Sequence, residues 1–286
     1  MKKLYDLSKK FPILVGIVGL LVIYSSFCNV PADSNPDSYK EAVLRIVLTI
    51  ACTGFIALIS GDKILVNSSN KTGKGILMGI PIIMINGIFT IPMFFFKLFD
   101  STPLVDGWYI KILLLAFYYL SVGFFEETLF RPLINDAILY QFRDKKGVFV
   151  AIALVSSFSF GIVHVWGSDI HNMVMFIQAS LKTISSAMAG FLLLTVYWRT
   201  RNIVACAIIH GLCDFVIIFS LDLFKSNAVA TNYVIEGTTE LGNLTVNMGV
   251  AQSFTYVIQI VLSIIAFLIM FKGIKKIDFK KIREEW

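Results

Sequence analysis

The sequence predicts an all-α membrane protein, a polytopic bundle of about eight transmembrane helices that forms a single membrane domain over residues 1–286. Apolar residues make up 57% of the chain and charged residues only 15%, with a mean hydropathy of +0.78. A soluble domain carries roughly 25% charged residues. The apolar residues gather into eight segments, and each is close to the roughly 17–25 residues that a spanning helix needs. The loops between these segments alternate in charge.

The eight segments, in chain order, cover about residues 11–30, 41–60, 75–98, 107–131, 147–166, 172–198, 202–222 and 248–271. The first is expected to be retained as a span, because no small-residue cleavage site follows it. The charged residues between the segments are, in the same order, Lys2, Lys3, Lys9 and Lys10; Asp33 and Asp37; Lys63, Lys71 and Lys74; Asp100 and Asp106; Arg143, Lys145 and Lys146; Asp169; Arg199 and Arg201; Asp222, Glu236 and Glu240; and Lys272, Lys275, Lys276, Lys280, Lys281 and Arg283.

Basic loops face the cytoplasm, and all of the basic loops fall on one side if there are eight spans. We therefore expect both termini to be cytoplasmic, in a multi-pass protein of the cell membrane. The net charge of +6 follows from these loops, so it indicates a lipid bilayer and no nucleic-acid partner. The four cysteines lie in apolar segments without the spacing of a zinc or disulfide framework, and we interpret them as small hydrophobic residues.

Ionisable residues inside the apolar segments are the functional candidates. Each costs about 2.5–3.5 kcal/mol at the centre of a bilayer, so a buried charge is by default a functional site that faces a cavity or a helix interface. They are Glu126, Glu127 and Arg131 in the fourth segment, His164 in the fifth, Lys182 in the sixth, and His210 and Asp214 in the seventh.

The fourth segment indicates a division of roles between its two adjacent carboxylates. Glu127 and Arg131 are four residues apart with the acid first, which is the favourable order for an ion pair on a helix. Glu126 points about 100° away from Glu127 and is left without a partner on its own helix. An unpaired buried carboxylate can act as a general base. The alternative is a buried ion pair that only fixes helix packing. Pro132 predicts that the helix breaks or kinks at Arg131.

The histidines extend this set to two more segments. His210 and Asp214 are four residues apart and share a helix face, as do Phe160 and His164. A carboxylate beside an imidazole fixes the tautomer of the ring. Three interpretations remain open for the whole set: a hydrolase that activates water, a metal site, and a proton or ion path. Lys182 is interpreted as the sign of a late start to the sixth span, after an interfacial helix near residues 170–181; it could also snorkel or pair with an aspartate.

Three motifs in order resemble those of one family. Glu-Glu-x-x-x-Arg at 126–131, Phe-x-x-x-His at 160–164 and His-x-x-x-Asp at 210–214 resemble the CAAX protease and bacteriocin-processing (CPBP or Abi) intramembrane peptidases, also called type II CAAX endopeptidases. The resemblance covers a catalytic core at about 107–222. It implies a helical bundle with a cavity open to the cytoplasmic side, and cleavage of a peptide bond near the C-terminus of a substrate or within a leader or membrane peptide.

Carried over by position, the resemblance implies that Glu126 activates the attacking water with help from His164. It implies that His210 and Asp214 line the oxyanion side and that Glu127 and Arg131 hold the motif in shape. The chain departs from the family by having Pro132 where many members have Gly, and Asp214 where others often have Asn. An ionised Asp cannot donate a hydrogen bond to an oxyanion, so Asp214 must be protonated, orient His210 or bind a metal.

We expect an intramembrane endopeptidase of a bacterial membrane that requires no cofactor. The alternative within that chemistry is a Zn²⁺ site made by Glu126, His164, His210 and Asp214. Expected substrates are leader peptides, small secreted peptides or membrane-protein segments. The rival functions are a non-catalytic immunity or scaffold protein of the same fold and a proton-coupled transporter.

Overall fold

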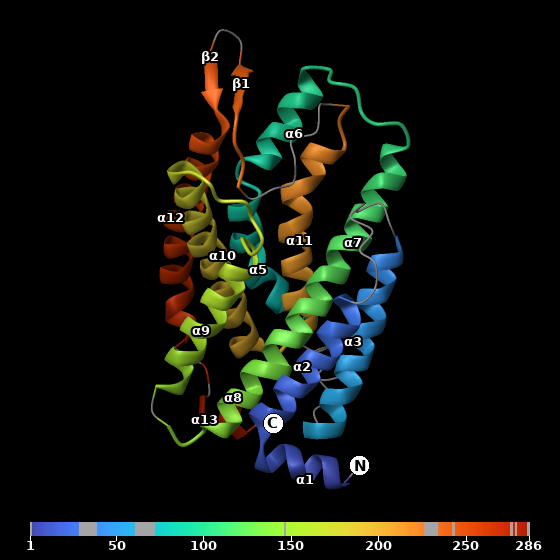
Figure 1. Ribbon diagram of the computed structural model, residues 1–286, viewed down its shortest axis with the longest axis vertical. Coiled ribbons are helices and arrows are strands. Elements are labelled where there is room, and N and C mark those ends of the chain that lie inside the picture. The colour runs from blue at the N-terminus through green and yellow to red at the C-terminus, as the bar shows by residue number, and fades with distance from the viewer. Residues whose placement is uncertain are drawn as a thin grey trace.

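A computed structural model describes residues 2–28, 39–60, 72–145, 147–225, 234–241, 244–274, 277 and 279–284. Nearly all of this chain is helical, with one short antiparallel hairpin (Figure 1). The helices and strands are α1 (Lys2–Lys10), α2 (Pro12–Cys28), α3 (Tyr39–Ser60), α5 (Thr72–Asn86), α6 (Thr90–Phe99), α7 (Trp108–Thr128), the π-helix η2 (Leu129–Asn135), α8 (Asp136–Gln141), α9 (Val148–Val163), α10 (Met173–Thr200), α11 (Ile203–Asp222), β1 (Thr238–Leu241), β2 (Leu244–Asn247), α12 (Met248–Ile274) and α13 (Phe279–Glu284).

The all-helical membrane fold is confirmed, but a count of eight spans is not. Each of the eight apolar segments contains a helix. Four helices of the described chain are long and apolar enough to cross a membrane, and up to six if each of two bent helix pairs is one span. The bends are 113° between α1 and α2 and 63° between α5 and α6, while α9 and the apolar part of α11 are shorter than a full span. Several of the loop charges, including Asp33, Asp37, Lys63 and Lys71, lie outside the described residues.

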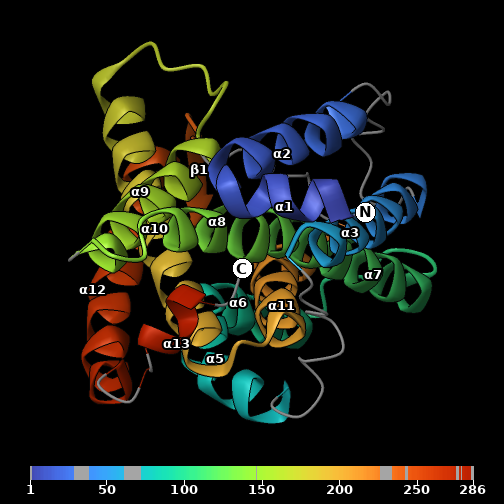
Figure 2. The ribbon, with the colours of Figure 1, turned by 90° about the horizontal axis from the view of Figure 1, so that it is seen from below.

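The helix that starts with α7 is the central element of the bundle. Seen from below in Figure 2, α7 and α8 run through the middle, with α2 and α3 on one side and α5 and α11 on the other. α1 and α13 lie at the same end of the molecule, opposite the hairpin (Figure 1). The middle position of α7 explains why its polar residues can meet side chains from several other helices.

Pro132 predicts a break or a kink at Arg131, and the structure contradicts the break, because the helix does not end there. It continues through the π-helix η2, which contains Pro132, and then through α8 to Gln141. Proline has no N–H to donate and its ring clashes with the carbonyl four residues earlier. A π-helical turn, whose hydrogen bonds span five residues, widens the helix at this point. The irregularity therefore lies directly after the Glu-Glu pair and keeps the helical direction.

Two glycines let α7 and α11 approach very closely. A Cβ atom added at Gly123 would lie 2.2 Å from the carbonyl oxygen of Ala207, and one at Gly211 would lie 2.7 Å from the carbonyl oxygen of Tyr119. Only glycine fits such backbone contacts. Gly123 is three residues before Glu126 and Gly211 follows His210, so this crossing brings the two functional segments together.

The sixth apolar segment does not contain the interfacial helix that was expected near residues 170–181. α10 is one continuous helix from Met173 to Thr200, so no separate interfacial helix precedes Lys182. The side chain of Asn172 accepts a hydrogen bond from the backbone N–H of Met175 and caps the start of α10. Arg201 then adopts a left-handed conformation at φ 51°, and Asn202 caps α11 by accepting from the N–H of Ala205. α11 therefore begins directly after α10.

Candidate active site

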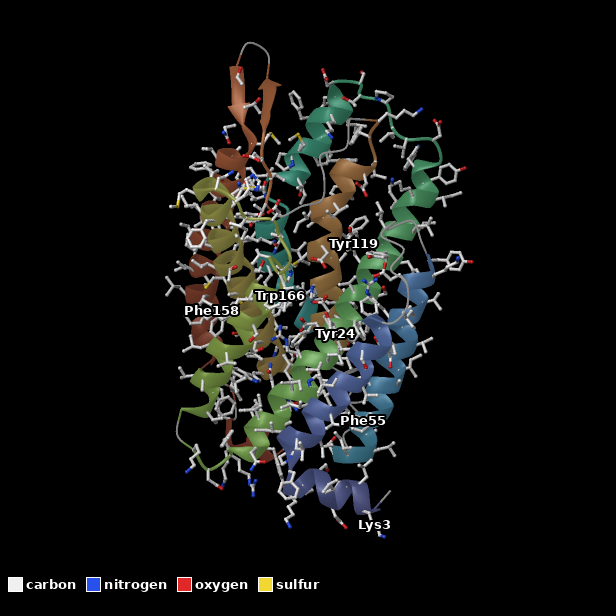
Figure 3. All side chains as sticks on the ribbon, viewed as in Figure 1. Lys3, Tyr24, Phe55, Tyr119, Phe158 and Trp166 are labelled. Atoms are coloured by element: carbon white, nitrogen blue, oxygen red, sulfur yellow. The ribbon has the colours of Figure 1, made fainter. Side chains whose placement is uncertain are left out.

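A cavity of about 620 Å³ contains the polar side chains that the motifs single out. It is lined by residues of α2, α3, α7, η2, α9 and α11, among them Glu126, His164, His210 and Asp214. Most of the other lining residues are apolar or aromatic. Figure 3 labels two of them, Tyr24 of α2 and Tyr119 of α7. Segments far apart in the sequence thus contribute to one chamber of mostly apolar walls with a few polar groups, which is typical of a ligand site.

Glu127 is the polar centre of the helix contacts behind the cavity. Its carboxylate accepts hydrogen bonds from Arg131, at 2.8 Å from Nε and 3.3 Å from Nη2, so the ion pair that the spacing predicts is present. The Nδ1 atom of His210 lies 3.1 Å from the Oε1 atom of Glu127. All three side chains are almost completely buried. Glu127 therefore connects Arg131 to His210, a link that the sequence analysis did not anticipate.

The other edge of the His210 ring faces two carboxylates. Its Nε2 atom lies 3.5 Å from the Oδ2 atom of Asp214 and 3.9 Å from the Oε2 atom of Glu126. The side chains of Glu126 and Asp214 retain 35% and 23% exposure, against 1% for Glu127. Glu126 and Asp214 can therefore meet a molecule inside the cavity, whereas Glu127 cannot. Because carboxylate oxygens face both ring nitrogens, His210 can donate to both sides only as an imidazolium.

His164 reaches the cavity from the end of α9 and has a defined orientation. Its Nδ1 atom lies 2.7 Å from the carbonyl oxygen of Phe160. A carbonyl can only accept, so Nδ1 carries the proton and Nε2 of the neutral ring is an acceptor. The ring of Phe160 packs against both histidines, with its centroid 4.5 Å from the centroid of His164 and 5.5 Å from that of His210. Phe160 thus restricts the movement of both imidazoles.

Lys182 lies at the back of the same region. A small second cavity is lined by Lys182, Asp214 and both histidines of the motifs. Lys182 is buried, and its Nζ atom lies 5.6 Å from the ring centroid of Tyr256 in α12. This burial does not agree with the possibility that Lys182 snorkels to the membrane surface. Its place in the same small cavity as Asp214 agrees with the possibility that Lys182 pairs with an aspartate.

One interpretation of the motifs was a metal site with nitrogen and oxygen ligands. Within the described parts of the chain, no group of three or more His, Cys, Asp or Glu side chains is arranged to hold a metal ion. The described cysteines, Cys52, Cys206 and Cys213, are free and buried.

Comparison with known proteins finds one family model that matches part of the chain. A family model described as type II CAAX prenyl endopeptidase Rce1-like matches residues 108–216. The resemblance to type II CAAX endopeptidases is confirmed. No curated protein and no solved structure matches the chain. The matched segment begins at the start of α7 and includes all three motifs. The match to a membrane protease family and the apolar helices together indicate a multi-pass membrane protein.

One charged residue of the cavity lining lies outside both the motifs and the matched segment. Arg45 of α3 lines the cavity and is 9% exposed. The sequence carried a signal for it, because Glu41 and Arg45 form an i,i+4 pair inside the second apolar segment, just as Glu127 and Arg131 do in the fourth. Arg45 belongs to none of the three motifs, so the motifs alone could not identify it.

Proposed function

We propose that this chain is an intramembrane endopeptidase that hydrolyses a peptide bond by attack of a water molecule held in the main cavity. The observation that carries the proposal is that Glu126, His164, His210 and Asp214, from three different helices, line one cavity in a chain otherwise built of apolar helices. The match to a peptidase family over the same residues supports it.

Glu126 is the proposed general base. Unlike Glu127, which pairs with Arg131, Glu126 lines the cavity and is exposed enough to meet a water molecule. In the proposed first step Glu126 takes a proton from the water while the oxygen attacks the carbonyl carbon of the substrate. The Nε2 atom of His164 would accept the second hydrogen of that water and orient it. Glu126 then returns its proton to the leaving nitrogen as the carbon–nitrogen bond breaks, which gives a carboxylic acid and an amine.

His210 is the proposed oxyanion donor. Its Nδ1 atom faces Glu127, and Glu127 is held by Arg131, so the ring has a fixed orientation with Nε2 toward the cavity. A preorganised N–H in a site of low dielectric stabilises the negative charge that develops on the substrate oxygen. Asp214, 3.5 Å from Nε2, would hold this N–H between turnovers and keep the imidazolium charged. Glu127 and Arg131 act through His210 and are positioning residues.

The proposed mechanism requires no metal ion, and the proposed substrate is a leader peptide, a small secreted peptide or a membrane-protein segment. The apolar walls of the cavity favour an extended apolar stretch. We propose a bacterial cell membrane with the site accessible from the cytoplasmic side, which rests on the basic loops and on the composition of the chain.

The test is peptide cleavage by the purified full chain in lipid nanodiscs. A mixture of synthetic apolar peptides is incubated with wild-type protein, Glu126→Gln and Glu236→Gln, and the products are identified by mass spectrometry. Glu236 is an exposed carboxylate beside His171, far from the motifs in sequence. We expect cleavage by wild type and Glu236→Gln and none by Glu126→Gln. Equal product formation by folded Glu126→Gln would refute the general-base role.

The rival functions give different results in the same preparations. A non-catalytic immunity or scaffold protein would produce no new peptide termini with any variant, although it could still bind peptides. A proton-coupled transporter would acidify liposomes in the presence of its cargo, and this flux would require His164 or His210. Flux without hydrolysis would replace the peptidase proposal.

A further inference from the structure

Lys182 of α10 is a buried lysine that the proposed mechanism does not use. It is 8% exposed, and its Nζ atom lies 5.6 Å from the ring centroid of Tyr256 in α12. Lysines inside membrane helices are costly, face the interior of the bundle and mark functional sites. The face of the Tyr256 ring attracts the ammonium group, but the ring carries no formal charge that would balance it.

A close crossing of α9 and α10 brings Lys182 to the site. A Cβ atom added at Gly161 of α9 would lie 2.2 Å from the carbonyl oxygen of Thr183 in α10, so only glycine fits at this contact. Gly161 is three residues before His164, and Thr183 follows Lys182 directly. This crossing therefore places a lysine and a histidine on the same side of the bundle interior.

The small cavity of about 40 Å³ joins this lysine to the motif residues. One face of α10 lines it, with residues that are about one helical turn apart: Lys182, Ser185, Ser186, Ala189 and Leu193. Asp214, His164 and His210 line both this cavity and the main one. A polar cavity of this size can hold a water molecule. The ammonium of Lys182 can therefore act on the carboxylate of Asp214 directly or through one water.

The charges of the described residues around the two cavities balance only when Lys182 is included. Two ion pairs are neutral in themselves, Glu127–Arg131 and Glu41–Arg45. His210, as an imidazolium, faces both Glu126 and Asp214 and can offset only one of them. His164 is neutral because its Nδ1 proton is directed to a carbonyl oxygen. Lys182 is thus the cation that matches the remaining carboxylate.

The proposed reaction moves negative charge toward Asp214. In the first step the charge leaves Glu126, which takes a proton, and develops on the substrate oxygen beside the Nε2 atom of His210. Asp214 lies 3.5 Å from the same Nε2 atom, so its carboxylate would repel the oxyanion. We propose that Lys182 offsets the charge of Asp214, so that Asp214 can hold His210 without opposing the oxyanion. This inference rests on the proposed function, and Lys182 is a positioning residue because it acts through Asp214.

The first test is a double-mutant cycle of peptide cleavage by the full chain in nanodiscs. Lys182→Met keeps the apolar stem of the side chain and removes the charge. We expect it to lower kcat at least about tenfold, less than the loss of a direct oxyanion donor, with KM changed less than about twofold. Asp214→Asn retains an oxygen that accepts from His210, and in this background Lys182→Met should cost less than about threefold.

Lys97→Met is the matched control for the loss of a lysine from an apolar helix. The Nζ atom of Lys97 in α6 also lies over an aromatic ring, 5.4 Å from the centroid of Phe224, but Lys97 lines neither cavity. We expect this variant to cleave peptides like wild type.

The second test needs no peptidase activity. Thermal unfolding of wild type, Lys182→Met, Asp214→Asn and the double variant is followed by the fluorescence of the four tryptophans. Residues that interact have non-additive effects on stability. The midpoint change caused by Lys182→Met should therefore be less favourable by about 3 °C or more with Asp214 present than in the Asp214→Asn background.

Equal loss of kcat from Lys182→Met in both backgrounds would overturn the inference, because Lys182 would then act independently of Asp214. Where Asp214→Asn cleaves too slowly for kinetics, additive changes in the unfolding midpoint would overturn it. If Lys182→Met does not fold, a folded double variant supports the inference and an unfolded one refutes it. If wild type hydrolyses no peptide, the peptidase proposal fails, and the midpoints decide whether Lys182 and Asp214 form a charge pair.

Discussion

The close approach of α7 and α11 at Gly123 offers a sharp test of how the site is assembled. In Gly123→Ala the new Cβ atom would lie 2.2 Å from the carbonyl oxygen of Ala207, about 1.2 Å short of the ordinary contact distance of 3.4 Å. Neither partner can turn away, because the contact is with backbone, so the two helices must separate by about 1 Å. Glu126 and His210 sit on either side of this crossing, and their present separation of 3.9 Å would widen by a similar amount.

A displacement of about 1 Å at reacting groups can cost on the order of a hundredfold in rate, and overpacking typically costs about 1–3 kcal/mol of stability. We therefore expect Gly123→Ala to cleave peptides about a hundredfold more slowly and to unfold at a lower temperature. Gly54→Ala is the matched control, because a Cβ at this exposed helix position meets nothing within 4 Å. Removing a helical glycine there should raise stability by about 0.5–1 kcal/mol. If both variants cleave and unfold alike, the close crossing does not govern the site.

Two further predictions concern burial and metal dependence. The hydroxyl of Thr128 is buried and has no hydrogen-bond partner among the described residues. Replacing it in Thr128→Val should therefore stabilise the protein by about 1 kcal/mol. A lower midpoint of thermal unfolding for Thr128→Val than for wild type would show that the hydroxyl has a partner. We expect peptide cleavage to be unchanged after prolonged dialysis against a chelator, with elemental analysis to verify that zinc has been removed. If cleavage is lost and returns only when Zn²⁺ is added, the result would favour a metal site made by Glu126, His164, His210 and Asp214.

The sequence was sufficient for the fold class and for the ionisable residues of the three motifs. Charged side chains are so costly in an apolar segment that Glu126, Glu127, His164, His210 and Asp214 stand out by composition alone. Helical periodicity then gave the Glu127–Arg131 pair, which the structure contains. Local spacing is sufficient here because residues four apart on a helix are always neighbours.

Contacts between helices could not be predicted in the same way. The contact of Glu127 with His210 depends on how α7 crosses α11, which is set by Gly123 and Gly211. The number of spans was equally uncertain, because length and hydropathy cannot show where a helix pair bends. The π-helix at Pro132 shows a related limit. Proline indicates a disturbance of the helix, but whether the chain breaks, kinks or widens depends on what packs around it.

The most direct test of the central claim is the source of the oxygen in the new carboxylate. Wild-type protein is incubated with a cleaved peptide in H₂¹⁸O, and single-turnover products are analysed by mass spectrometry beside those of Glu126→Gln. If Glu126 activates a water molecule in the cavity, the wild-type product carries one ¹⁸O atom at its new C-terminus, and Glu126→Gln yields no product above background. Unlabelled product, or labelled product formed at the wild-type rate by Glu126→Gln, would contradict the mechanism.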